Sequence, residues 1–154
     1  MIIFKQILPF LLLLIYLIYC SYSDIKNKSI SLYISIISML ICIIQDIVLK
    51  DFTITNFFIS LIPGIVLLIL SCIFSNSLGK GDGIIILICG IHIGVFFTLK
   101  ILLIALLFSA FYSIFLLMRK HSLKDIFPFA PFILLSYIVN LLFWTIQKTY
   151  FYSS

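Results

Sequence analysis

The chain has 154 residues, of which 64% are hydrophobic and only 10% are charged, and its 10 Lys+Arg against 5 Asp+Glu give a formal net charge of +5. A soluble domain is about 45–50% apolar and about 25% charged. This composition excludes a soluble globular domain, a disordered chain and a typical nucleic-acid-binding protein. It predicts an all-helical integral membrane protein in which the charge excess reflects topology.

Six apolar segments predict six transmembrane helices packed in a compact bundle, which forms a single domain over residues 1–154. One bilayer-spanning helix needs about 20 apolar residues, so six spans use most of the chain. The stretch from Ile84 to Met118 is too long for one ordinary span, and we expect a tight turn at Lys100. The predicted spans are residues 2–19, 30–49, 54–75, 84–99, 101–118 and 128–147.

The first apolar segment is interpreted as a retained span and not as a cleaved signal peptide. Lys26 and Lys28 follow it directly, and such charges tend to remain in the cytoplasm. A lipoprotein signal ending at Cys20 is not expected either, because the bulky Tyr19 stands where such a signal has a small residue.

Basic residues favour one side of the predicted bundle. The first, third and fifth connections hold Lys26, Lys28, Lys80, Arg119, Lys120 and Lys124, whereas the other side holds Lys5, Lys50, Lys100 and Lys148. The positive-inside rule therefore predicts that the odd-numbered connections face the cytoplasm. The acids on that side are Asp24, Asp82 and Asp125, and those on the outer side are Asp46 and Asp51.

Two of these acids carry the candidate chemistry. Asp24 follows the first span, and Asp82 precedes the fourth in the segment Gly79-Lys80-Gly81-Asp82-Gly83. A carboxylate at the edge of the hydrocarbon usually has a partner or a function, although a solvated residue at a helix end is the plain alternative. The glycines allow close backbone approach and positive φ angles, which predicts an active-site turn lining a wet pocket; a plain flexible turn is the alternative here.

Asp24 and Asp82 would form an aspartic dyad if they shared one water molecule. Two adjacent carboxyls do not both ionise readily, so one retains a proton. The ionised carboxyl then takes a proton from water, and the protonated one donates to the substrate carbonyl oxygen. The pair titrates as a unit, so the sequence does not assign the acid and the base.

The remaining polar residues are given structural interpretations. Gly90 and Gly94 form a GxxxG pair that favours helix packing, and His92 is expected to be a hydrogen-bonded packing residue in the same span. His121 and Asp125 are interpreted as solvated charges of a basic loop. No metal or cofactor is expected, because no CxxC motif or Cys/His cluster occurs. We expect the four cysteines to be small apolar residues packed in the membrane helices: Cys20, Cys42, Cys72 and Cys89.

Three separated segments resemble the type IV prepilin peptidases, the GxGD class of membrane aspartic proteases. The first runs from Asp24 through Lys26 and Lys28 to Ile30. The second is Gly79-Lys80-Gly81-Asp82, followed by Gly90 and Gly94 at the family's offsets. The third contains Pro128-Phe129-Ala130-Pro131, similar to the family's proline-phenylalanine signature, and is expected to serve the substrate or helix packing.

This resemblance implies that Asp24 and Asp82 are the catalytic pair of an intramembrane endopeptidase. It implies a prepilin or pilin-like precursor as substrate, with its short basic leader removed at the cytoplasmic face of the inner membrane. The resemblance is to the short, peptidase-only members, because the N-terminal region with paired CxxC motifs is absent; methyltransferase activity is not expected. The sequence departs from the family's pattern at Ser31, Ile84 and Ala130.

Two other function classes remain open on the sequence. A non-enzymatic membrane assembly subunit would need no paired acids, so asparagine at either position would be harmless. A small proton-coupled carrier would need an acid near the middle of the bilayer, whereas these acids lie at span ends. A protease of the presenilin type has a tyrosine before its first acid, where this chain has Ser23.

Overall fold

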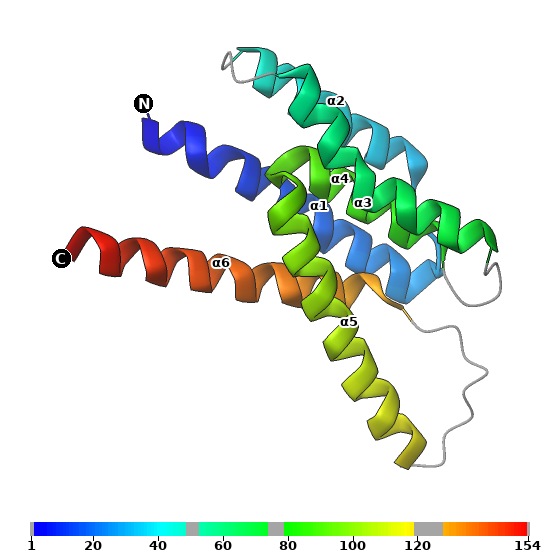
Figure 1. The fold of residues 1–154 in the computed structure, drawn as a ribbon. Helices are drawn as coiled ribbons and strands as arrows, with labels where there is room; N and C mark the ends of the chain where they lie inside the picture. The colour runs from blue at the N-terminus through cyan, green and yellow to red at the C-terminus, as the bar shows by residue number, and fades with distance from the viewer. Residues whose placement is uncertain (1, 49–52, 74–78, 119–127, 154) are drawn as a thin grey trace.

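The computed structural model describes residues 2–48, 53–73, 79–118 and 128–153, and within these ranges the regular structure is entirely α-helical (Figure 1). The helices, in chain order, are α1 (Ile2–Asn27), α2 (Leu32–Val48), α3 (Ile54–Ile73), α4 (Lys80–Ile93), α5 (Val95–Met118) and α6 (Ala130–Ser153).

The helix ends differ from the prediction at two places. Helix α1 continues past the apolar segment to Asn27, so Asp24 lies in its last turn and not in a connection. The expected turn at Lys100 is wrong, because α5 runs through that residue and the break falls at Gly94. A lone lysine does not interrupt a helix, whereas Gly94 has φ +80 and ψ 167, a conformation that is essentially restricted to glycine.

The break at Gly94 leaves few backbone groups without partners. The N–H of Gly94 donates to the carbonyl oxygen of Gly90 at 2.8 Å. The carbonyl oxygen of Gly94 then accepts two hydrogen bonds from Thr98, one from its N–H at 3.2 Å and one from its Oγ1 at 2.8 Å. Paired backbone groups are what allow a chain to change direction at apolar depth.

Among the residues that the structure describes, four helices are long and apolar enough to cross a membrane, so the six predicted spans are supported only in part. The shorter helix α2 is apolar over Leu32–Gln45. Helix α4 has 14 residues, which corresponds to about 21 Å, less than the roughly 30 Å of a hydrocarbon core. The four candidate spans are Leu8–Asn27, Ile54–Ile73, Val95–Leu116 and Ala130–Gln147.

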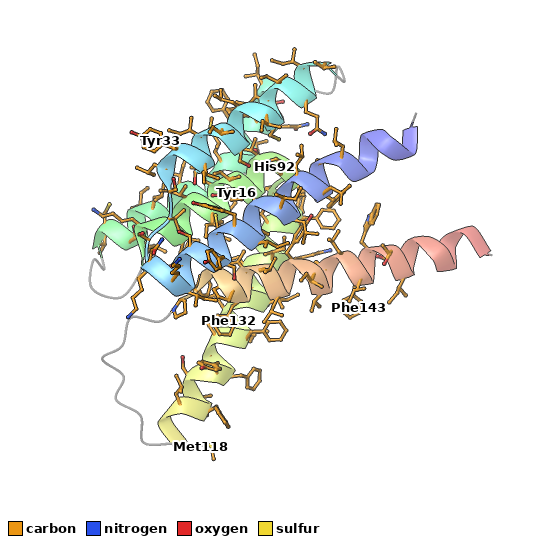
Figure 2. All side chains as sticks on the ribbon, turned by 180° about the vertical axis from the view of Figure 1, so that it is seen from behind. Tyr16, Tyr33, His92, Met118, Phe132 and Phe143 are labelled. Atoms are coloured by element: carbon orange, nitrogen blue, oxygen red, sulfur yellow. The ribbon has the colours of Figure 1, made fainter. Side chains whose placement is uncertain are left out.

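Large apolar side chains cover the outside of the molecule. Tyr33 of α2, Met118 of α5 and Phe143 of α6 are all exposed and project away from the bundle (Figure 2). Contiguous apolar surface on this scale is foreign to a water-soluble monomer and is normal where lipid covers the protein.

The short helix α4 lies at the centre, in contact with α1, α2, α3 and α5 (Figure 1). Its side chains supply much of the core, including the fully buried Ile85, Ile86 and Cys89. A Cβ at Gly90 would collide with the backbone oxygen of Ser60 on α3, so α3 and α4 approach closely there. A Cβ at Gly94 would meet nothing within 4 Å.

Candidate active site

Asp24 is held by the start of a helix that is distant in sequence. Its Oδ2 accepts a hydrogen bond of 3.1 Å from the N–H of Ala130, the first residue of α6, and the N–H of Phe129 also lies within hydrogen-bonding reach of the carboxylate. Helix N-termini carry free N–H groups and a partial positive charge, both of which favour a carboxylate. The tertiary fold therefore gives Asp24 the role of capping α6.

The end of α1 fixes the backbone on which Asp24 stands. Lys28 adopts a left-handed conformation with φ 51, and its N–H donates to the carbonyl oxygen of Asp24 at 3.0 Å. This arrangement is a common way to end a helix. The hydroxyl of Ser23, which is buried, donates to the carbonyl oxygen of Ser29 at 2.8 Å and so secures the segment after the helix.

Asp82 lies in the first turn of α4, three residues after Gly79. Its N–H donates to the carbonyl oxygen of Gly79 at 3.1 Å, and its carboxylate lies within hydrogen-bonding reach of the Gly79 N–H. An acid at this position that bonds back to the residue preceding the helix forms half of a capping box. Asp82 is thus fixed to the helix start by local contacts alone.

Asp24 and Asp82 lie at the same end of the bundle, within electrostatic reach of each other. Burial raises the pKa of Asp82 from its ordinary value of 3.8 to about 7, and the negative charge of Asp24 contributes to this increase. A carboxyl with a pKa in this range can hold its proton near neutral pH. The two sequence-predicted acids are therefore brought together, as an acid–base pair requires.

The glycines around Asp82 act differently from the prediction. Gly79 precedes α4 with φ −70 and ψ 129, and Lys80, Gly81 and Gly83 belong to the first turn of the helix, so the predicted irregular turn is wrong. Among the described residues the only glycine with positive φ is Gly94. The glycines are needed for space: a Cβ at Gly79 would lie 3.0 Å from the Asp82 carboxylate.

Two further glycines bring neighbouring elements close to the start of α4. A Cβ at Gly81 would collide with the side chain of Ile30, and a Cβ at Gly83 would collide with Leu68 of α3. Ile30 is the residue six positions after Asp24, so the contact ties the segment after α1 to the helix that carries Asp82. Gly81 therefore brings the segment after α1 close to the helix that carries Asp82, and Gly83 brings α3 close to the same helix.

Two polar contacts join α2 to its neighbours, one to α1 and one to α4. The Tyr16 hydroxyl and Ser35 Oγ are 2.9 Å apart, and Ser38 Oγ lies 3.1 Å from Nε2 of His92. His92 is 7% exposed, which confirms that it is a hydrogen-bonded packing residue. Sequence reasoning missed Tyr16 and Ser35, whose only signal was a polar group inside an apolar segment.

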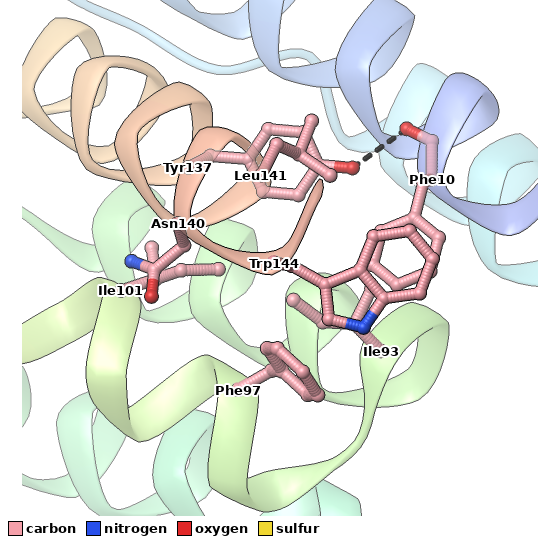
Figure 3. Close-up of a pocket in the computed structure, with 8 residues that line it drawn as sticks. All are labelled: Phe10, Ile93, Phe97, Ile101, Tyr137, Asn140, Leu141 and Trp144. Carbon is pink, nitrogen blue, oxygen red and sulfur yellow. Dashed lines mark hydrogen bonds between the residues drawn. The ribbon is translucent and has the colours of Figure 1, made fainter. Parts of the chain in front are cut away.

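The apolar hollow in Figure 3 lies away from the two acids. Phe10 of α1, Phe97 of α5 and Trp144 of α6 line it, and the Tyr137 hydroxyl donates to the Phe10 carbonyl oxygen beside it at 2.7 Å. Phe10 precedes Asp24 by fourteen positions on α1, or about 21 Å along the helix. The hollow has room for little more than one water molecule and has no polar lining surface.

Some predicted residues fall outside the described part of the chain. Asp51, His121 and Asp125 lie there, together with the basic residues Lys50, Arg119, Lys120 and Lys124. Asp46 lies in the last turn of α2, and its side chain is not described. Cys20, Cys42 and Cys89 are buried, whereas Cys72 is exposed.

The described helices that are long and apolar enough to cross a membrane indicate a multi-pass membrane protein. A sequence profile of the type IV leader peptidase family matches residues 11–114, which is more than half of the chain. The chain belongs to this family and is a type IV leader peptidase-like protease. The matched range includes both Asp24 and Asp82 and ends before α6. No curated protein and no solved structure matches the chain.

Proposed function

We propose that this protein is an aspartic endopeptidase that removes the short basic leader of prepilin or pilin-like precursors, with Asp24 and Asp82 as its catalytic pair. The observation that supports the proposal is that these two carboxyls, on helices far apart in the sequence, lie within electrostatic reach of each other. Family membership supports prepilin-type substrates in general.

The reaction needs only the two carboxyls and water. One carboxyl takes a proton from the water as its oxygen attacks the scissile carbonyl carbon, and the other donates its proton to the carbonyl oxygen. The tetrahedral intermediate then collapses: the C–N bond breaks as the carbonyl re-forms, the proton taken from water passes to the leaving amine, and a hydroxyl proton returns to the carboxyl that donated one. The pKa of Asp82, raised to about 7, supports this division because one carboxyl must enter the cycle protonated.

The substrate geometry follows from the position of the acids. Asp24 and Asp82 lie at the ends of apolar helices, and we expect this position to match the junction between a leader and its membrane-embedded helix. Basic residues gather at this end: Lys26, Lys28 and Lys80 are exposed there. By the positive-inside rule we assign this end to the cytoplasmic face of the inner membrane.

Co-expression with precursor pilins from the same genome tests the proposal, with leader removal followed as a mobility shift and by mass spectrometry of the new N-terminus. Asp24→Asn and Asp82→Asn should each abolish processing. Asp46→Asn is the matched control, because it makes the same change in the last turn of α2, and it should process normally. Processing that survives both active-site changes would overturn the dyad and favour an assembly subunit or a carrier.

A further inference from the structure

The segment at the start of α6 leaves two backbone N–H groups without partners inside the helix. Pro128 and Pro131 have no N–H at all. The N–H groups of Phe132 and Ile133 both donate to the carbonyl oxygen of Phe129, at 3.0 and 3.3 Å. Between the two prolines this leaves the N–H groups of Phe129 and Ala130, and both face the Asp24 carboxylate.

We propose that the segment Pro128–Pro131 is the positioning element of the active site, holding Asp24 as the ionised member of the pair and thereby assigning it the role of general base. The two prolines contribute because they lack N–H groups, so that only the N–H groups between them are available to the carboxylate. Asp82 is then the member that enters the cycle protonated and donates to the carbonyl oxygen. The roles of general base and general acid rest on the proposed function. The ionisation of Asp24 does not, because it is a property of the protein without substrate.

Burial of Asp24 disfavours its charged form, and the N–H groups of Ala130 and Phe129 act against this effect. Charge-assisted hydrogen bonds from N–H groups at a helix start favour the carboxylate form, and the dipole of α6 acts in the same sense. Cys20 on the same helix and Asp82 on α4 lie within electrostatic reach of Asp24, and the exposed Lys26, Lys28 and Lys80 belong to the same end of the bundle. The first turn of α6 contributes no acidic side chain. Asp82 has its own helix start, but it is the more deeply buried acid and it faces the negative charge of Asp24.

Ala130 is the position at which the hydrogen bond to Asp24 can be removed. Ala130 is fully buried, and the first position of a helix is the one that best accepts proline. Ala130→Pro therefore removes the N–H that bonds Asp24 while the helix start stays compatible with its backbone. Ala130→Val adds similar bulk and retains the N–H, so it is the matched control. Replacement of Ala130 by lactic acid turns the N–H into an ester oxygen with no added bulk.

The first measurement needs no substrate. Infrared spectra of the purified protein follow the protonated carboxyl band of Asp24 during titration, as the difference between each variant and its own Asp24→Asn partner. Loss of one charge-assisted hydrogen bond should move protonation of this carboxyl to higher pH by about one unit in Ala130→Pro and in the lactic acid variant. Ala130→Val should titrate as the parent does. Equal titration in all variants overturns the positioning role, and so does an equal shift in Ala130→Val.

The second measurement connects the segment to turnover. In the pH profile of kcat/KM on a leader peptide, the acid limb should move upward by the same amount in the two variants that lack the N–H and stay in place in Ala130→Val. A structural defect alone would lower the whole profile without moving the limb. If no precursor is cleaved by the parent, the proposed function fails while the infrared result still decides the ionisation of Asp24. If Ala130→Pro does not fold, the lactic acid variant supplies the same comparison.

Discussion

Ser38 and His92 are 54 positions apart in the sequence, and their side chains join α2 to α4 through a hydrogen bond of 3.1 Å. The other ring nitrogen of His92, Nδ1, is buried without a partner in the described structure. The hydroxyl of Ser38 is therefore the one described partner that offsets burial of this ring. This contact fixes the central helix against α2.

Ser38→Ala should destabilise the protein by about 1–3 kcal/mol, because it leaves a second buried nitrogen of His92 unsatisfied. The measurement is unfolding of the purified protein in a mild detergent. Ser109→Ala is the control: its hydroxyl bonds only to Leu106 of its own helix, at 2.9 Å, and its loss should cost less than about 0.5 kcal/mol. Equal losses for both variants would contradict the interhelical role.

Gly90→Ala should cost more than an ordinary helix substitution, because the new methyl group would meet the backbone of Ser60 and not a flexible side chain. Overpacking of this kind typically lowers the free energy of unfolding by about 1–3 kcal/mol. We expect a value toward the upper end, because a backbone moves less readily than the end of a side chain. Gly81→Ala, which meets the end of the Ile30 side chain, should be milder. Thermal unfolding ranks the two, and the reverse order would refute the close approach of α3 and α4.

Gly94→Ala should destabilise for a different reason. The space around Gly94 is open, so the cost is the backbone strain of an alanine at φ +80 and ψ 167, about 1–3 kcal/mol. Gly94→Ser, in which the side chain is larger than in Gly94→Ala, should lose a similar amount of stability. A loss that grows with side-chain volume would show that packing, and not the φ angle, is the constraint.

The pH dependence of stability should reflect Asp82. Its pKa in the folded protein is raised to about 7, whereas an aspartate in an unfolded chain has a pKa near about 3.9. The folded state therefore binds this proton more tightly, and the stability it contributes is full below about pH 4 and is lost as pH rises through about 7. Thermal unfolding at pH 5 and pH 8 should show a larger decrease for the parent than for Asp82→Asn. The same decrease in both proteins would contradict the raised pKa.

Lys26→Glu should leave turnover on a leader peptide within about fivefold of the parent. The ammonium group of Lys26 lies 5.6 Å from the centre of the Tyr22 ring and donates to the Tyr22 hydroxyl at 3.4 Å, at an exposed position. This charge would repel a basic leader, so we do not expect Lys26 to bind the leader. A large gain in kcat/KM for Lys26→Glu would show that this repulsion limits substrate entry.

The apolar segments of the sequence predicted most of the helices, because burial in lipid imposes a simple requirement on composition. The spans expected at residues 30–49 and 54–75 correspond closely to Leu32–Val48 and Ile54–Ile73. The break at Gly94 was missed because charge was used as the marker, whereas the constraint was a dihedral angle. The extension of α1 to Asn27 was missed because polar residues at a helix end do not stop the helix.

The sequence predicted the two acids of the candidate site but not the backbone groups that bind them. Asp24 and Asp82 could be selected because an acid beside apolar helices is costly. The hydrogen bond between Asp24 and Ala130 joins residues 106 positions apart, and no local pattern encodes such a contact. The two prolines were visible, and their lack of N–H groups was the one signal that could have indicated a carboxylate partner.

The shortness of α4 has a consequence for the response to the surrounding lipid. This helix contacts four others and does not have to match the thickness of the bilayer with its own length. Hydrophobic mismatch acts on the lipid-facing helices, which respond by tilting. We therefore expect thin and thick bilayers to change the tilt of α5 and α6, while the immersion depth of Asp82 is set by protein contacts and stays constant across membranes of different lipid composition.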